Sequence, residues 1–257
     1  MDALLLAAGR GSRLGVLTQS TPKCLVSIAG RPLLDYWLEQ LNASNGISRV
    51  FVNVHYLGEQ VQEFLSLSPF ARKVQVVHET RLWGTGGTLA RLVASYGPFE
   101  EGLFVAHADN LTLFGLEGFL ARHHSRPEYC LATVMTFETD TPSSCGIFKL
   151  NEQNVVVEFF EKVAHPPGRL ANGAVFAFSS AALAALCQQF KGLQAEAGQT
   201  EEVFDLSRDF LPKLVGRLWT FHNDVYHRDI GTPASLAAAN GNFPGVRTRF
   251  LTGQAEL

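Results

Sequence analysis

Apolar and polar residues alternate in blocks along the first half of the chain. Asp2 to Ala8 is an almost continuous apolar run that ends at Gly9, which is typical of a strand buried on both faces of a parallel sheet. Leu33 to Leu41 follows a proline and carries apolar residues at helical spacing, so it predicts a helix. The alternation continues with predicted strands at Val50–Val54, Val74–His78 and Leu103–Ala106 and predicted helices at Glu59–Leu65 and Thr88–Tyr96. This order predicts parallel strands with helices on both faces of the sheet.

The pattern changes after about Tyr129, where strand-like runs follow one another with little helix between them. These runs are Leu131–Phe137, Ile147–Leu150, Val155–Phe160 and Ala174–Phe178. Two helices and a late strand are then predicted at Ala181–Phe190, Phe204–Val215 and Leu218–His222. We therefore expect the second half to extend the same sheet with some antiparallel strands. No linker rich in proline or glycine separates the halves, so we predict one domain over residues 1–257.

Composition narrows the class of protein. With 257 residues, 46% of them apolar and 18% charged, the chain can bury a sizeable core. It has 21 Lys and Arg and 24 Asp and Glu, and the basic residues form no stripe along the sequence. Nucleic acid is therefore not expected as the main partner. The first apolar run is short and is preceded by Asp2. We therefore expect neither a signal peptide nor a membrane span, and a soluble, cytoplasmic protein.

Cysteine and histidine spacing argues against a metal site built on these residues. The four cysteines form no C-x-x-C pair, so we predict free thiols at Cys24, Cys130, Cys145 and Cys187. No H-E-x-x-H motif is present. The adjacent His123 and His124 follow a predicted helix, and we interpret them as part of a solvated turn.

Candidate chemistry begins in the loop after the first strand, L-L-L-A-A-G-R-G-S-R-L-G. The loop holds two glycines and two arginines, namely Gly9, Gly11, Arg10 and Arg13. Backbone N–H groups and guanidinium groups in such a loop can contact a polyphosphate. The loop is not the dinucleotide fingerprint, which needs a third glycine where Leu14 stands, and it is not a Walker A loop. A plain strand-to-helix turn would explain the glycines but not the arginines.

Two further motifs make the pattern specific. Lys23 lies in S-T-P-K-C-L, and G-R-P-L-L-D-Y follows from Gly30 to Tyr36. Together with the glycine-rich loop, these motifs resemble the signature of the sugar-1-phosphate nucleotidylyltransferases, of the mannose-1-phosphate guanylyltransferase or glucose-1-phosphate thymidylyltransferase type. The resemblance implies a three-layer α/β/α sandwich with a Rossmann-like mixed sheet. It also implies an enzyme that joins a nucleoside triphosphate to a sugar 1-phosphate and releases pyrophosphate.

Later segments are similar to the family's other motifs. H-E-T-R-L-W-G-T-G-G-T-L resembles its base-reading loop, and H-A-D-N-L and Y-H-R-D-I-G-T-P resemble its two metal motifs. S-S-C-G-I-F, F-F-E-K-V and L-A-N-G-A look like its sugar-binding segments. The resemblance therefore implies a nucleotide-binding half at 1–128, a sugar-binding half at 129–240 and a C-terminal tail at 241–257. There are three departures from the common pattern, at Cys24, Trp83 and Val163.

The resemblance carries roles onto individual residues. It implies catalytic roles for Arg13, Lys23 and Asp109, and one Mg²⁺ ion held by Asp109 and Asp229. The nucleotide-binding residues that it implies are Leu6, Ala7, Ala8, Gly9, Gly11, Ser12, Glu79, Gly84, Thr85 and Gly87. The sugar-phosphate-binding residues that it implies are Asn110, Gly146, Glu161, Lys162 and Asn172. Because a phosphate oxygen is already ionised at neutral pH, no general base is needed for the attack.

The base and the sugar are less well defined by the sequence. A carboxylate at Glu79 complements the N1–H and N2–H donors of guanine, which favours GTP, and the second half resembles enzymes acting on mannose- or heptose-type 1-phosphates. A carboxylate can also bind the single N3–H of uracil or thymine. Uridylyl or thymidylyl transfer to an amino-sugar 1-phosphate (N-acetylmuramate or N-acetylglucosamine) or to glucose 1-phosphate therefore stays open.

Two other kinds of protein are alternatives to a nucleotidylyltransferase. A nucleotide-sugar-dependent glycosyltransferase would usually show Asp-x-Asp at a strand end, but here Ala108 lies between His107 and Asp109. A non-catalytic module that only binds nucleotide sugars would be expected to lack some of the charged residues, and all four of Arg13, Lys23, Asp109 and Asp229 are present. A homo-oligomer is possible, and the sequence does not decide it.

Overall fold

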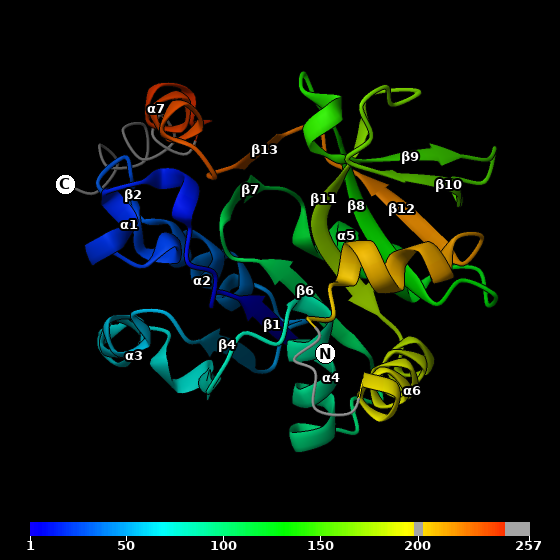
Figure 1. Cartoon of the computed structure of the whole chain (residues 1–257), viewed down its shortest axis with the longest axis horizontal. Coiled ribbons are helices and arrows are strands. Elements are labelled where there is room, and N and C mark those ends of the chain that lie inside the picture. The colour runs from blue at the N-terminus through cyan, green and yellow to red at the C-terminus, as the bar shows by residue number, and fades with distance from the viewer. Residues whose placement is uncertain (198–202, 245–257) are drawn as a thin grey trace.

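The computed structural model describes residues 1–197 and 203–244, and its centre is one mixed sheet (Figure 1). The strands of this sheet are β1 (Asp2–Leu6), β4 (Val50–Val54), β5 (Val74–His78), β6 (Leu103–His107), β8 (Ala132–Glu138), β9 (Gly146–Leu150), β10 (Val156–Glu161), β11 (Leu170–Phe178) and β12 (Leu218–His222). They lie in the order β10-β9-β11-β6-β1-β4-β5, and β8 pairs with both β11 and β12. The strands β5, β4, β1 and β6 are parallel, whereas β11 runs antiparallel to β6. The predicted change from a parallel to a mixed arrangement is confirmed.

Helices cover both faces of the sheet. They are α1 (Leu17–Ser20), α2 (Leu33–Ala43), α3 (Gly58–Leu67), α4 (Thr85–Tyr96), α5 (Leu116–His124), α6 (Ser180–Ala197) and α7 (Pro233–Asn242). Alternate residues of β1 belong to different cores, because Leu4 packs with residues of α4 and α6 and Leu5 packs with residues of α2, α3 and α5. The molecule therefore has the expected three layers. No helix of the described residues is long and apolar enough to cross a membrane.

Two small sheets lie outside the main one. The strands β2 (Ser27–Ile28) and β3 (Arg31–Pro32) form a short hairpin, and β7 (Asn110–Leu113) pairs antiparallel with β13 (Tyr226–Asp229). In Figure 1, the orange β13 returns from the second half of the chain to reach the green β7. Neither β7 nor β13 was predicted. They bring chain segments from the two halves into direct contact.

The helix α7, also not predicted, packs against the N-terminal half. A third apolar cluster includes Tyr36, Tyr226 and the buried Phe243, whose ring lies edge-on to both tyrosine rings at 5.0 and 5.2 Å. The Asn240 side chain accepts a hydrogen bond of 2.8 Å from the backbone N–H of Ala29 in the β2–β3 turn. The start of the predicted tail is thus part of this cluster, and residues 245–257 lie outside the described residues.

Several predicted boundaries were wrong. The first strand ends at Leu6, so Ala7 and Ala8 belong to the following loop, and the helix predicted from Thr88 begins at Thr85. The helix predicted at 204–215 is a π-helical segment, Leu206–Phe210, followed by a 3₁₀ segment. The Asp205 carboxylate accepts hydrogen bonds from the N–H groups of the two residues Ser207 and Arg208, which caps the π-helical segment. The four cysteines are free thiols as predicted, and burial raises the pKa of Cys24 to about 12.

His123 was wrongly assigned to a solvated turn. It lies in the last turn of α5, is only 1% exposed and has its Nδ1 atom 3.1 Å from the hydroxyl of Thr133 on β8. Burial disfavours the charged ring, and the nearby Arg126 adds repulsion, so the pKa of His123 falls to about 3. The side chain faces the core because α5 extends to His124 and packs against β8.

This shift predicts a pH dependence of stability. In the unfolded chain His123 has its ordinary pKa of 6.5, so between pH 6.5 and about 3 the unfolded state binds more protons than the folded state. The free energy of unfolding should therefore fall as the pH falls through this window, by up to about 1.4 kcal/mol per pH unit. Urea unfolding at pH 7 and pH 5 should show a smaller loss for His123→Gln than for the native protein. Equal losses would contradict the assignment.

Candidate active site

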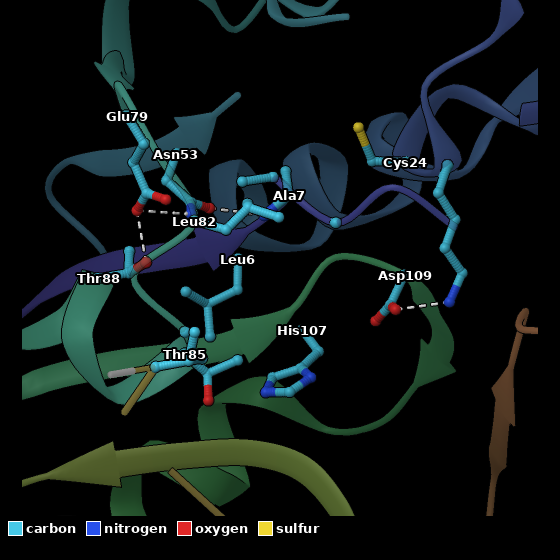
Figure 2. A pocket seen from close by; sticks show the side chains of 15 residues that line it. Leu6, Ala7, Cys24, Asn53, Glu79, Leu82, Thr85, Thr88, His107 and Asp109 are labelled. Carbon is cyan, nitrogen blue, oxygen red and sulfur yellow. Dashed lines mark hydrogen bonds and ion pairs between the residues drawn. The ribbon is translucent and has the colours of Figure 1, made fainter. Parts of the chain in front are cut away.

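A cavity of about 320 Å³ opens at the carboxyl ends of the central parallel strands, where ligands of open α/β sheets usually bind (Figure 2). Nine of the predicted site residues line it, namely Leu6, Ala7, Ala8, Gly9, Lys23, Glu79, Gly84, Thr85 and Asp109. Six residues that were not predicted complete the lining, namely Cys24, Asn53, Leu82, Thr88, His107 and Val203. The cavity therefore joins segments from β1, β4, β6 and the loop before α4.

The charged end of the cavity is built around Lys23. Its ammonium group donates hydrogen bonds to Asp109 Oδ2 at 2.6 Å and to Asp229 Oδ1 at 3.4 Å, and its side chain is only 6% exposed. The guanidinium of Arg13 approaches the other oxygen of Asp229 at 3.4 Å. The structure thus brings together all four charged residues that the motifs singled out.

Local backbone structure holds these groups in place. The β7–β13 ladder pairs Asp229 with Asn110, and the N–H of Ile230 donates to the carbonyl of Asp109 at 3.2 Å. Asn110 itself is buried, and its carbonyl accepts a hydrogen bond from the Trp37 indole. The two aspartates therefore lie together although they belong to opposite halves of the chain.

The donor set fits a hard divalent cation. Two carboxylates converge on one positive charge, and Mg²⁺ usually takes one or two carboxylates together with substrate phosphates. Within the described residues there is no group of three or more His, Cys, Asp or Glu that could hold a metal by itself. Burial alone would raise the pKa of Asp109, but the Lys23 ammonium and His107 outweigh it and hold that pKa below its ordinary value. Asp109 is therefore ionised at neutral pH, as a metal ligand must be.

The opposite end of the cavity presents the Glu79 carboxylate. Glu79 Oε1 accepts a hydrogen bond from Asn53 Nδ2 at 3.1 Å and another from the Thr88 hydroxyl, as the dashed lines of Figure 2 show. Asn53 Oδ1 also accepts from the backbone N–H of Ala7 at 2.7 Å. Asn53 is a buried polar residue in the apolar strand V-F-V-N-V, and this break in the pattern was the signal that could have identified it.

Asn53→Ala should damage both stability and nucleotide binding. The substitution removes the acceptor of the Ala7 N–H, and a buried donor without a partner costs about 1–3 kcal/mol. It also releases one of the two donors that orient Glu79, so the KM for the nucleotide should rise. Urea unfolding and steady-state kinetics measure the two effects, with Asn45→Ala, at an exposed position after α2, as a control. A normal KM in a destabilised variant would show that Asn53 supports only the fold.

The glycine run before α4 is positioned by a segment that the sequence did not reveal. The N–H groups of Gly86 and Gly87 both donate to the carbonyl of Phe204, at 2.9 and 3.0 Å, and the Thr85 hydroxyl donates to Asp205. Gly87 lies under Trp83 and does not line the cavity, whereas Gly84 does, with a φ of 79°. These two N–H groups at the start of α4 therefore already have a protein partner.

The glycine-rich loop after β1 has one exposed part and one packed part. Gly9, Ser12 and Arg13 are exposed, and Ser12 opens a 3₁₀ turn that ends at Leu14. Gly11 has a φ of 65°, and a Cβ atom there would lie 2.9 Å from Lys23 Cβ. Gly11 therefore supports Lys23, and the exposed residues of the loop are free to meet a ligand.

The predicted sugar side lies on β9, β10 and β11. Gly146 pairs with Glu161, and a Cβ at Gly146 would be 2.5 Å from Glu161 Oε2, so only glycine leaves room for this carboxylate. Burial raises the pKa of Glu161, although Lys162, whose ammonium lies 3.4 Å from it, opposes the change. Asn172 Oδ1 accepts from its own strand at Ala174 N, where the β11–β8 register shifts. None of these four residues lines the cavity described above.

The three departures from the common motif have distinct surroundings. Cys24 is buried beside Lys23, and Trp83 stacks with the guanidinium groups of Arg81 and Arg91 at 3.7 and 4.2 Å from its ring centre. This stack stiffens the loop between Glu79 and Gly84. Val163 lies just after Lys162, which adopts a left-handed backbone with a φ of 49°.

Several curated proteins are similar in sequence to this chain. The chain is 24% identical over its whole length to the bifunctional protein GlmU of Methanococcus maripaludis, of which it covers 57%. It is 30% identical over 70% of its length to the mannose-1-phosphate guanylyltransferase catalytic subunit beta of Drosophila pseudoobscura pseudoobscura, of which it covers 48%. The chain thus spans about half the length of these curated relatives.

A solved structure and a family model also match this chain. A crystal structure of a putative glucose-1-phosphate thymidylyltransferase from Bacillus anthracis, in complex with a sucrose, superposes with a TM-score of 0.75 over 94% of both chains at 18% identity. The model of the nucleotidyl transferase family matches residues 2–244, which include the cavity and all four charged residues. By its sequence motifs, its fold and this match, the chain belongs to the nucleotidyl transferase family.

Proposed function

We propose that the protein transfers a guanylyl group from GTP to a mannose- or heptose-type sugar 1-phosphate and releases pyrophosphate. The observation that carries the proposal is the contact of one buried ammonium, that of Lys23, with two carboxylates at the end of a nucleotide-sized cavity. An ammonium group next to two carboxylates that can hold a metal ion is suited to bind the phosphates of two substrates close together. The mannose-1-phosphate guanylyltransferase among the relatives supports the same substrates.

The reaction needs positioning and charge neutralisation more than covalent catalysis. The sugar phosphate oxygen attacks the α-phosphorus in line, and pyrophosphate leaves on the opposite side. Lys23 would bind the α-phosphate and the attacking phosphate, because its ammonium lies at the charged end of the cavity. Arg13, which is exposed at the edge of the loop, would hold the β- and γ-phosphates of the leaving group.

Asp109 and Asp229 would hold Mg²⁺, which supplies positive charge to the phosphate oxygens of both substrates when it is bound. In the structure these carboxylates are held by Lys23, so the protein keeps them together before any cation binds. Their separate origins on β6–β7 and β13 mean that both halves of the chain must be folded for the site to exist.

The choice of GTP rests on Glu79. Both donors from the protein reach the same oxygen, Oε1, and this arrangement leaves Oε2 to accept from a ligand. Guanine offers two N–H donors on its pairing edge, whereas uracil and thymine offer one between two carbonyl acceptors. An acceptor-only group fixed at this point therefore matches guanine best.

The test is pyrophosphate release with Mg²⁺, in which GTP, UTP, dTTP, CTP and ATP are each combined with the 1-phosphates of mannose, heptose, glucose, N-acetylglucosamine and N-acetylmuramate. Turnover of GTP with the mannose or heptose compound supports the proposal. Turnover of another pair, such as UTP with an amino-sugar 1-phosphate, would retain the reaction and overturn the substrates. Binding of GDP-mannose without any turnover would overturn the reaction in favour of a binding module.

A further inference from the structure

Resting on this proposed function, we propose that His107 reads a hydroxyl group of the acceptor sugar and thereby helps to determine which sugar 1-phosphate is used. His107 is the last residue of β6, lies two residues before Asp109 and lines the cavity. The motif comparison gave it no role.

Most polar side chains of the cavity already have hydrogen-bond partners within the protein. Lys23 binds Asp109, Asn53 and Thr88 bind Glu79, and Thr85 binds Asp205. The buried Nε2 atom of His107 has no hydrogen-bond partner among residues 1–197 and 203–244. A buried polar atom without a partner costs about 1–3 kcal/mol, so its presence in a ligand cavity indicates a group kept for the ligand.

The order of the strands defines the position of His107 along the sheet. Glu79 follows β5, Asn53 lies on β4 and Ala7 follows β1, so the base end of the cavity occupies one side of the sheet. His107 pairs with Leu6 and lies on β6, whose other neighbour is β11. From β6 the sheet continues to β11, β9 and β10, the strands that carry the predicted sugar-binding residues. His107 therefore lies at the boundary between the phosphates and the sugar.

The surroundings of the ring agree with this position. Figure 2 shows the His107 ring on the side of the cavity where Thr85 and Asp109 lie, away from Glu79 and Asn53. A turn of the ring about its Cβ–Cγ bond exchanges its carbon and nitrogen edges, so a ring nitrogen can face the cavity while the backbone stays in place.

The experiment uses two substitutions of different chemistry. His107→Leu removes the ring nitrogens, whereas His107→Gln keeps an amide nitrogen near the position of Nε2. With GTP and mannose 1-phosphate, we expect His107→Leu to lose about tenfold to a hundredfold in kcat/KM, mainly through the KM for the sugar, and His107→Gln to recover part of the loss. Thermal unfolding of both variants shows whether they are folded.

Sugar analogues identify the contact. Deoxymannose 1-phosphates that lack the 2-, 3-, 4- or 6-hydroxyl should each be compared in the native protein and in His107→Leu. One analogue should lose activity in the native protein and show no further loss in the variant. Equal additional losses with every analogue would overturn the proposal.

A binding measurement separates this proposal from the proposed function. Calorimetric titration of GDP and of GDP-mannose should show that His107→Leu weakens only GDP-mannose. Equal weakening of both ligands would assign His107 to the nucleotide and overturn the proposal. Because this comparison does not need turnover, its result stands even if the native protein fails to release pyrophosphate.

Discussion

Replacing Asp109 by asparagine is expected to lower kcat/KM for pyrophosphate release by about a hundredfold or more. The asparagine keeps the shape of the side chain but removes the charge that faces Lys23 and the proposed Mg²⁺. Lys23 retains Asp229 as a partner, so the buried ammonium is not left unpaired and the protein should stay folded. The Mg²⁺ concentration for half-maximal activity should also rise.

Asp224→Asn is the matched control, because Asp224 is an exposed carboxylate between β12 and β13 and lies outside the cavity. It should retain native activity, and Asp229→Asn should behave like Asp109→Asn. If Asp109→Asn kept a third or more of the native kcat/KM at every Mg²⁺ concentration, Asp109 would have no part in the reaction.

Gly11→Ala and Gly9→Ala are both expected to lower kcat/KM, but for different reasons. At Gly11 the backbone is left-handed, and the new Cβ would meet the side chains of Lys23 and Thr18 at 2.9 and 3.1 Å. Strain in a left-handed residue costs about 1–2 kcal/mol, and displacement of Lys23 should lower kcat about a hundredfold. At Gly9 no described atom lies within 4 Å of the new Cβ, so the fold should be unaffected.

Gly9→Ala should instead raise the KM for the nucleotide, because the added methyl group would enter the space proposed for the phosphates. Urea unfolding and steady-state kinetics of the two variants measure the difference. Equal stability of Gly11→Ala and the native protein would contradict the role of Gly11 as a support of Lys23. An unchanged KM in Gly9→Ala would place the phosphates elsewhere.

Predictions from sequence succeeded where a local pattern carries the information. The apolar runs at β1, β4 and β6 identify buried parallel strands, and the motifs around Lys23, Asp109 and Asp229 identify charged residues that the fold brings together. Such motifs are short, contiguous and spaced in a way that chance rarely produces. The parallel core and the charged end of the cavity could therefore be predicted.

The features that were missed depend on distant parts of the chain. β7 and β13 are four residues each and become strands by pairing with each other, which no local pattern reveals. The Phe204 carbonyl accepts hydrogen bonds at the start of α4 although it lies far along the chain. The role of Asn53 depends on its hydrogen bonds with Ala7 and Glu79, which lie in other segments. Burial of His123 likewise depends on β8, against which α5 packs.

The pairing of β7 with β13 has a consequence for a chain that is still being synthesised. Lys23 precedes Asp109 by 86 residues and Asp229 by 206 residues, so a growing chain acquires the second carboxylate only when it is nearly complete. Until β13 has left the ribosome and reached β7, the Lys23–Asp109 pair lacks Asp229, and the proposed cation site has half of its ligands. The proposed cation site is therefore completed only by one of the last parts of the chain to be synthesised.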